Sequence, residues 1–406
     1  MHVVLIEPAF PVNQREFVRA LAAVGARVTA IGERPVDSFD PDLKGWLHRY
    51  HQVRSVVDER AVGYLVEQIM RSEPVDRLEA TIEAHIMSTA RVREALGIPG
   101  TSEHTAYLCR DKPAMKEALR QAGIPCAQST GATSADAVWD FARRVGYPLI
   151  LKPPAGAGAS GTIKVDNDQQ LAAALPGTGV ERGQALAVEE FIEGHEGFYD
   201  TICINGRVVH DFACHYYPGV LEAMRTRWIS PQFICTNRVD QDGYDEIREM
   251  GRRVVEALGI GTSATHMEWF YGPKGLKFSE IGCRPPGVRA WDLYAKANDI
   301  DIYREWAMAV VHGRPGARCS RRYSAGIIAL RPSQDGVISG YAGLDVMQQR
   351  YGQWVMDHHL PPEGTPTQGV EAGYMANAWI RMFHPDYDEL RTMLNAVGET
   401  VKVWAR

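Results

Sequence analysis

Residues 150–162 read ILKPPAGAGASGT, and the elements on either side of them decide between two folds. Gly156, Gly158 and Gly161 spell G-x-G-x-x-G, the pattern of the phosphate-binding turn in a dinucleotide-binding domain. In that domain the glycines lead from a strand directly into a helix, whose N-terminus faces the pyrophosphate. Here strand-like YPLILK precedes the glycines and β-branched TIKV follows them, so the loop joins strand to strand. The sequence therefore argues against a Rossmann turn. It predicts a hairpin loop suited to closing over phosphates, the alternative being a surface hairpin without a ligand.

Composition narrows the class of protein. The chain has 406 residues, enough for several buried cores, and a net charge of −6 from 44 Lys plus Arg and 50 Asp plus Glu. This balance argues against a nucleic acid or an anionic membrane as the main partner. Seven scattered cysteines without a C-x-x-C spacing are typical of reduced thiols. With no basic leader and no apolar run of membrane-spanning length, we expect a cytoplasmic protein.

The order of strands and helices predicts four consecutive units. The N-terminal part alternates short apolar strands, beginning HVVLIE, with helical stretches, which predicts a small doubly wound α/β domain. Its first strand-to-helix turn, EPAFPVN, contains no glycine, so this domain lacks the dinucleotide signature. The last part is rich in strands and predicts a small α+β cap. The predicted boundaries are 1–105, 106–185, 186–321 and 322–406.

Two lysines stand where a phosphate chain is readily held. Asp111 caps a predicted helix, DKPAMKEALRQAG, and Lys112 adds its charge to the positive end of that helix. Lys152 ends the strand that precedes the glycines. Taken alone, Lys112 is more typical of a solvated first turn. The role of Lys112 therefore depends on which other residues lie near it in the fold.

The stretch THMEWFYGPKGLKFSEIGCRPPG (265–287) predicts two strands joined by a turn. A three-residue loop at 273–275 would place Glu268 opposite Glu280, with Cβ atoms roughly 5 Å apart on one face. Facing carboxylates repel unless a cation or a proton lies between them, and oxygen ligands suit Mg²⁺. In the same register His266 lies opposite Gly282. A four-residue loop would shift this register, and two solvated surface glutamates are the alternative.

With these residues assembled, the chain resembles the ATP-grasp superfamily of carboxylate–amine ligases, and in particular the L-amino-acid ligases of the bacilysin-synthetase type. The resemblance lies in the Lys-bearing helix start, the YPLILK strand with its glycine loop, VEEFIEGHE (188–196), GTSATHME (261–268) and SEIGCRPPG (279–287). It implies an ATP-grasp fold of mixed α/β and α+β class. A doubly wound pre-grasp domain would precede the grasp, and the small α+β cap would follow it.

The resemblance also implies roles for individual residues. Arg284, with His266, would steady the carboxylate substrate and the developing charge, while Glu196 would bind the ribose hydroxyls. Glu268 and Glu280 would bind Mg²⁺, for which Mn²⁺ would substitute. The phosphates would be contacted by Lys112, Lys152 and the closing loop, which includes Gly158, Ser160 and Gly161. Adenine would be held, largely through main-chain groups, by Glu189, Glu190, Phe191 and Ile192.

The activity that the resemblance implies is ATP-dependent formation of an amide bond through an acylphosphate, with release of ADP and phosphate. Gly282 stands where many members of the superfamily have a metal-binding Asn, and RPPGVRAW replaces the run typical of biotin carboxylases, which argues against bicarbonate. A formyl or carboxyl transferase acting on a nucleotide precursor, or a regulator that binds nucleotide without turnover, are the alternatives. The partners would be a small carboxylate and an amine, with a homodimer as a further option. Their identities do not follow from the sequence; the candidate substrate contacts are Glu83, Tyr216 and Arg289.

Overall fold

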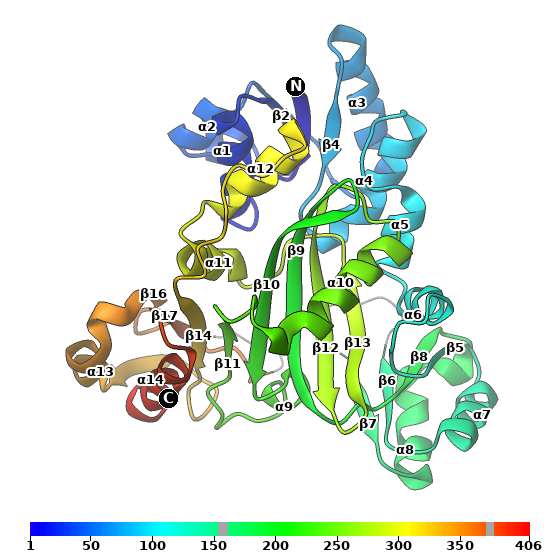
Figure 1. The fold of residues 1–406 in the computed structure, drawn as a ribbon, viewed down its shortest axis with the longest axis vertical. Coiled ribbons are helices and arrows are strands. Elements are labelled where there is room, and N and C mark those ends of the chain that lie inside the picture. The colour runs from blue at the N-terminus through cyan, green and yellow to red at the C-terminus, as the bar shows by residue number, and fades with distance from the viewer. Residues whose placement is uncertain (153–160, 371–376) are drawn as a thin grey trace.

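The computed structural model describes residues 1–152, 161–370 and 377–406. Its N-terminal lobe, at the top of Figure 1, is built on a parallel sheet of order β3-β2-β1-β4. Alternate residues of β1 pack on opposite faces: Val3 and Leu5 contact the cluster that includes α1, and Val4 and Ile6 contact the cluster of α3 and α4. The lobe is therefore covered by helices on both faces, as a doubly wound domain requires. Its elements are β1 (His2–Ile6), α1 (Gln14–Ala23), β2 (Arg27–Gly32), α2 (Pro41–Trp46), β3 (Arg49–Gln52), α3 (Glu59–Ser72), β4 (Arg77–Glu79), α4 (Glu83–Ala95) and α5 (Glu103–Leu108).

A small antiparallel sheet of order β5-β8-β6-β7 forms the second lobe. Leu149 pairs with Val165 and Leu151 with Ile163, so the predicted strand-to-strand connection across the glycine segment is confirmed. Residues 153–160 of that segment lie outside the described part of the chain. The elements are α6 (Lys112–Gln121), β5 (Ser129–Ala132), α7 (Ala135–Val145), β6 (Leu149–Lys152), β7 (Ile163–Val165), α8 (Asp168–Thr178) and β8 (Leu186–Glu190).

The central sheet has eight strands within the described residues, in the order β13-β12-β9-β10-β11-β14-β17-β16. β9 and β10 are joined at Asn205 and Gly206, whose φ values of 48° and 80° suit a type I′ turn. This part of the chain also contains four α-helices. The elements are β9 (His195–Ile204), β10 (Arg207–Tyr217), α9 (Val220–Ala223), β11 (Gln232–Cys235), α10 (Asp245–Ala257), β12 (Ser263–Gly272), β13 (Gly275–Gly282), α11 (Ala290–Asn298) and α12 (Ile302–His312).

The C-terminal segment is α+β as expected, but it is not a separate layer. β14, β17 and β16 extend the central sheet beyond β11, while β15 pairs with β18. Every residue of β14 is buried, so its apolar pattern fits an interior strand of a large sheet as well as a small cap. The elements are β14 (Ser324–Leu330), β15 (Ile338–Ala342), α13 (Leu344–Tyr351), β16 (Val355–His359), β17 (Ala378–His384), α14 (Tyr387–Thr400) and β18 (Lys402–Ala405).

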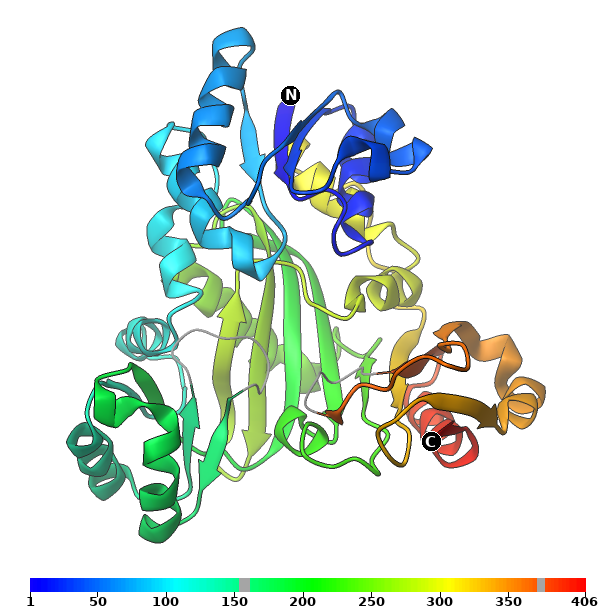
Figure 2. The same cartoon turned by 180° about the vertical axis from the view of Figure 1, so that it is seen from behind.

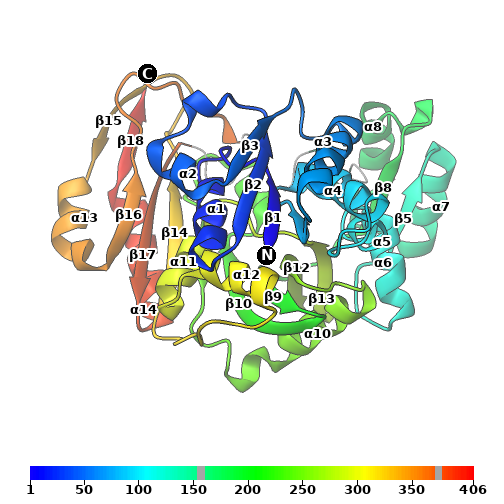
Figure 3. The same cartoon turned by 90° about the horizontal axis from the view of Figure 1, so that it is seen from above.

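The N-terminal lobe packs against α11 and α12 through an aromatic contact. Phe17 on α1 lies 5.2 Å from Trp291 and 5.0 Å from Trp306 between ring centroids, and Figure 3 shows α12 beside α1. Figure 2 shows, from behind, the small sheet and the C-terminal strands on opposite sides of β9, β10, β12 and β13. This arrangement brings the start of α4 to the end of β13, where two lobes meet at the candidate site.

Candidate active site

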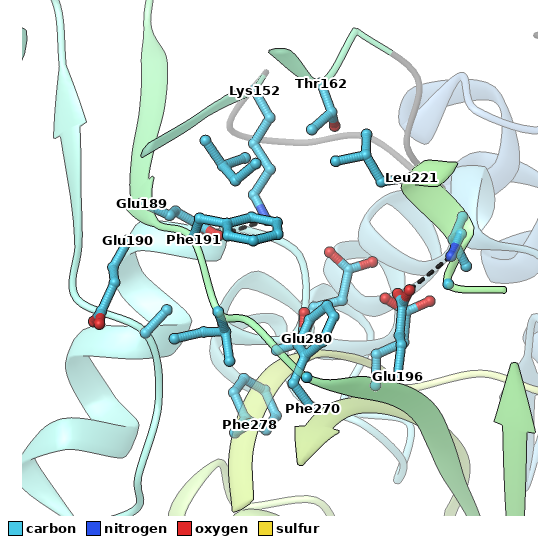
Figure 4. A pocket seen from close by; sticks show the side chains of 18 of the residues that line it. Lys152, Thr162, Glu189, Glu190, Phe191, Glu196, Leu221, Phe270, Phe278 and Glu280 are labelled. Carbon is cyan, nitrogen blue, oxygen red and sulfur yellow. Dashed lines mark hydrogen bonds and ion pairs between the residues drawn. The ribbon is translucent and has the colours of Figure 1, made fainter. Parts of the chain in front are cut away.

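A cavity of about 400 Å³ lies between the small sheet and the β12–β13 hairpin (Figure 4). Its walls come from β6 and β8 on one side, from β9, β12 and β13 on the other, and from α9 at one end. The main chain ties these walls together, because Phe278 N donates to Pro125 O at 2.8 Å and so fixes the segment after α6 along β13. The cavity therefore lies between two sheets whose relative position is set by main-chain contacts.

The predicted pairing of Glu268 with Glu280 is confirmed, although the predicted loop is wrong. Gly272 pairs with Gly275, so the turn has two residues rather than three. A bulge then shifts the register between Trp269 and Glu268, which leaves Ser279 as the extra residue of β13. Beyond the bulge Glu268 faces Glu280, and His266 faces Gly282 as predicted.

Glu189, near the end of β8, holds two buried lysines at one carboxylate oxygen. Lys116 Nζ and Lys152 Nζ each lie 2.7 Å from Glu189 Oε2, and Figure 4 shows the contact with Lys152. Burial raises the pKa of Glu189, but the two ammonium groups outweigh burial and bring that pKa to about 2. Burial also lowers the pKa of Lys116 to about 8. For Lys152 the effect of burial is outweighed by Glu189 and Glu280, which raise its pKa.

Three carboxylates lie on the β9–β12–β13 side of the cavity. Burial and the nearby Glu268 raise the pKa of Glu196 to about 8, and burial with Glu280 raises the pKa of Glu268. Glu280 is also buried, but Lys112, whose Nζ is 2.8 Å from Glu280 Oε2, and Lys152 lower its pKa. Crowded carboxylates of this kind are stabilised by a cation.

The chemistry of these carboxylates fits Mg²⁺. Glu268 and Glu280 offer hard oxygen ligands from directly opposed strand positions. In the described part of the chain no three His, Cys, Asp or Glu side chains form a ready metal site, so a bound ion would take its other ligands from phosphate oxygens or water. That division of ligands is the usual one for Mg²⁺.

The predicted adenine end of the cavity is mostly apolar. The N–H groups of Glu190 and Phe191 donate to the carbonyls of Gln128 and Pro148, so they hold this segment in place. The Glu190 carboxylate pairs with Lys274. The apolar residues that line the cavity include Ile150, Phe191, Ile192, Phe270 and Phe278.

Glu196, predicted to bind the ribose, takes part in a main-chain contact. Its Oε2 accepts a hydrogen bond of 2.6 Å from Val220 N, at the start of α9, and Figure 4 shows its side chain in the cavity near Leu221. The contact anchors α9, which lines the cavity, against β9. Its predicted role at the ribose stays a prediction.

A second, smaller cavity of about 20 Å³ lies behind Glu280, and Glu280 lines both cavities. Glu83, a candidate substrate contact, is paired here with two arginines, and its predicted role stays a prediction. Arg110 Nη1 lies 3.0 Å from Glu83 Oε1, and Arg284 Nε lies 2.9 Å from Glu83 Oε2. The N-terminal lobe thus supplies the counter-ion of Arg284. Lys112 and His266 complete the charged part of this lining.

His266 contacts a buried carboxylate, Asp200, that sequence reasoning missed. His266 Nδ1 lies 2.7 Å from Asp200 Oδ1, and although burial lowers the pKa of His266, the Asp200 carboxylate raises it overall. Asp200 also accepts a hydrogen bond of 2.5 Å from Tyr294. Asp200 lies opposite His266 on β9, a pairing between strands distant in sequence. Nothing in the local pattern predicts that register.

The remaining predicted residues are only partly brought together. Tyr216 and Arg289 are not among the described residues that line either cavity. Tyr216 stacks near Phe198, with ring centroids 4.9 Å apart, and Arg289 pairs with Asp292. Gly161 sits in a turn with φ of 70°, whereas Gly158 and Ser160 lie outside the described residues.

Comparison with known proteins finds similarity to ATP-grasp ligases of the type that the sequence predicts. Residues 111–198 match the model of the carbamoyl-phosphate synthase L chain ATP-binding domain. The chain is 25% identical over 321 residues to the L-arginine-specific L-amino acid ligase of Bacillus subtilis, covering 77% of this chain and 76% of that protein. It is 25% identical over 256 residues to the alanine–anticapsin ligase of Bacillus subtilis strain 168, covering 57% and 52%.

The fold agrees over the whole length. An L-amino acid ligase from Bacillus licheniformis has a TM-score of 0.77 at 19% identity, covering 100% of this chain and 98% of that one. The chain therefore has the ATP-grasp fold, and its predicted resemblance to ATP-grasp ligases of the L-amino-acid ligase type is confirmed. Within residues 1–152, 161–370 and 377–406, no helix has the length and apolar character to cross a membrane.

Proposed function

We propose that this protein is an ATP- and Mg²⁺-dependent carboxylate–amine ligase that forms an amide bond between two small molecules. The observation that carries the proposal is the charge arrangement of the larger cavity. Lys116 and Lys152 lie on one wall, and Glu196, Glu268 and Glu280 lie on the other. A polyphosphate carrying Mg²⁺ complements both walls, because its oxygens meet the ammonium groups and its cation meets the carboxylates.

Each part of the reaction has a candidate group. ATP supplies the phosphoryl group that activates a carboxylate, which by itself is a poor electrophile. Arg284 and His266, which line the smaller cavity with Glu280, are suited to hold that carboxylate beside the phosphates. Apolar side chains such as Phe191 and Phe270 exclude water, which protects an acylphosphate until an amine attacks it. The segment 153–160, predicted to close over the phosphates, lies outside the described residues.

The named relatives suggest the substrate class. One is an L-arginine-specific L-amino acid ligase and another an alanine–anticapsin ligase, so both substrates of this chain are proposed to be amino acids. We further propose that Mn²⁺ replaces Mg²⁺, since both ions accept carboxylate and phosphate oxygens.

The products distinguish this route from its alternatives. Incubation with ATP, Mg²⁺ and pairs of amino acids is expected to release one ADP and one phosphate for each amide formed, measured by chromatography and a phosphate assay. Release of AMP and pyrophosphate would contradict the acylphosphate route. Turnover that depends on bicarbonate or a formyl donor, and on no amino-acid pair, would contradict amide formation and favour a transferase.

A further inference from the structure

A further cavity, which we call the rear cavity, lies on the face of the central sheet opposite the candidate active site. Its volume is about 270 Å³, and its walls come from β9, β10, β12 and β13 and from the start of α10, which crosses in front of these strands in Figure 1. Successive side chains of a strand point to opposite faces of the sheet. Glu196 and Glu268 line the larger cavity of the candidate active site, whereas their neighbours His195 and Trp269 line the rear cavity.

Aromatic and imidazole rings line much of the rear cavity and stand at steep angles to one another. Trp269 pairs with Gly197 on β9, and Gly197 pairs with His215 on β10, so one row of residues crosses three strands. A Cβ on Gly197 would lie 2.3 Å from Trp269 Cζ2, so the indole can lie across β9 only because this residue has no side chain. The ring planes of Trp269 and His215 meet at 88°, and those of Tyr244 and His215 meet at 70°. Rings at such angles form the walls of a box rather than a stack.

The two histidines of the rear cavity are polar but uncharged. His195 Nε2 lies 2.9 Å from His215 Nδ1, and His215 Nε2 lies 2.8 Å from the hydroxyl oxygen of Tyr244. Burial lowers the pKa of His215 to about 3 and also lowers the pKa of His195, and the charge of Arg391 adds to both effects. Both imidazoles are therefore neutral at neutral pH and do not repel a cation.

Glu246, exposed in the first turn of α10, is the charged side chain that lines the rear cavity within the described residues. Two arginines are near the cavity, but each lies over a ring that does not line it. Arg391 lies 4.1 Å from the ring centroid of Tyr217, and Arg238 lies 5.1 Å from that of Tyr387 and pairs with an aspartate. The lining itself therefore carries one negative charge among aromatic rings.

We propose that the rear cavity binds a small organic amine, with its ammonium group between the aromatic rings and Glu246. An ammonium group is attracted to the electron-rich faces of Trp and Tyr rings, and a carboxylate beside the rings strengthens that attraction. Tyr271, which also lines the cavity, is 55% exposed, so an apolar group on the amine would cover it. Because the rear cavity lies on the other face of β9 and β12, its ligand would not occupy the candidate active site. The inference does not depend on the proposed ligase function.

Three probes of nearly equal shape separate the charge of the ligand from its size. At neutral pH phenethylamine is a cation, phenethyl alcohol is neutral and phenylacetate is an anion. In titration calorimetry without nucleotide, phenethylamine is expected to bind at least about fivefold more tightly than either of the other two. Absence of phenethylamine binding, equal binding of all three probes, or tighter binding of phenylacetate would overturn the proposal.

Substitutions on the rim locate the bound amine. Glu246→Gln should weaken phenethylamine binding about fivefold, and Tyr271→Ala should weaken it about threefold or more. Both side chains are exposed, so both variants should fold as the parent does. Glu249→Gln removes a charge one turn further along α10, outside the lining of the cavity, and is the matched control that should bind phenethylamine as the parent does.

A further variant distinguishes the rear cavity from the candidate active site, where an amine substrate would also bind. Glu280→Gln removes the carboxylate that lines both cavities of that site. Phenethylamine binding is expected to be unchanged in Glu280→Gln and weakened in Glu246→Gln. Binding that is lost in Glu280→Gln but kept in Glu246→Gln would place the amine in the candidate active site and overturn the proposal.

Discussion

Glu268→Gln is expected to lower the rate of ATP-dependent amide formation by about a thousandfold while leaving the fold intact. Removing a carboxylate from the proposed site of Mg²⁺ and phosphate should weaken neutralisation of charge in the transition state by several kcal/mol. The fold should be unharmed, because burial and the facing Glu280 already raise the pKa of Glu268. A neutral amide removes that repulsion and leaves no buried lysine without its closest carboxylate. Thermal unfolding should therefore show an unchanged or higher melting temperature.

The measurement is the initial rate of phosphate release at saturating Mg²⁺. Glu280→Gln should lose activity to a similar degree, with a lower melting temperature than Glu268→Gln, since Lys112 then loses its carboxylate partner. The exposed Glu399→Gln is the control and should match the parent in both rate and stability. Near-parental turnover of either variant would contradict a metal role for the opposed glutamates.

Glu189→Ala is expected to reduce the free energy of unfolding by about 3–5 kcal/mol, the usual cost of leaving a buried charge without its partner. Here two buried ammonium groups, Lys116 and Lys152, lose the same carboxylate. Glu189→Gln keeps an acceptor oxygen and should lose less. Glu117→Ala on α6 breaks only exposed contacts, with Arg120 and Gln121, and should leave stability almost unchanged. The measurement is urea unfolding at constant pH.

The loss in Glu189→Ala should depend on pH with a definite sign. In the folded parent the pKa of Lys116 is already lowered to about 8 from 10.5, and removal of Glu189 lowers it further. The folded variant therefore prefers the neutral amine. Its loss relative to the parent from Lys116 is full below the folded pKa of the variant and shrinks as the pH rises towards about 8, where Lys116 of the parent also loses its charge. A stability loss that stays constant between pH 7 and 9 would contradict this account of the buried lysines.

The sequence was most informative where a pattern depends only on local order. The strand-to-strand setting of the glycine segment follows from YPLILK and TIKV alone, and the pairing of Leu149 with Val165 confirms it. The Glu268–Glu280 pairing was also predicted, but through a three-residue loop that does not exist. A two-residue turn and a bulge at Ser279 together give the same register. Bulges cannot be predicted reliably from a sequence. The pairing was therefore predicted correctly only because the shorter turn and the bulge shift the register in opposite directions.

The residues that were missed depend on contacts between distant segments. Lys116 carries a local signal, its i, i+4 spacing from Lys112, but its burial against Glu189 depends on how α6 packs across the small sheet. Asp200 faces His266 only because β9 and β12 are neighbours in the central sheet. The C-terminal strands have a pattern that fits a small cap or a large sheet equally well. In each case the position of the residue or strand depends on a contact with a distant segment, rather than on the local residue pattern.

A crystal structure with Mg²⁺ and a non-hydrolysable ATP analogue tests the central claim most directly. The account predicts the nucleotide in the cavity between the small sheet and the β12–β13 hairpin, with Mg²⁺ on Glu268 and Glu280. Lys152 Nζ should then lie within hydrogen-bond distance of phosphate oxygens. A nucleotide bound elsewhere, or an Mg²⁺ ion that contacts neither glutamate, would contradict it.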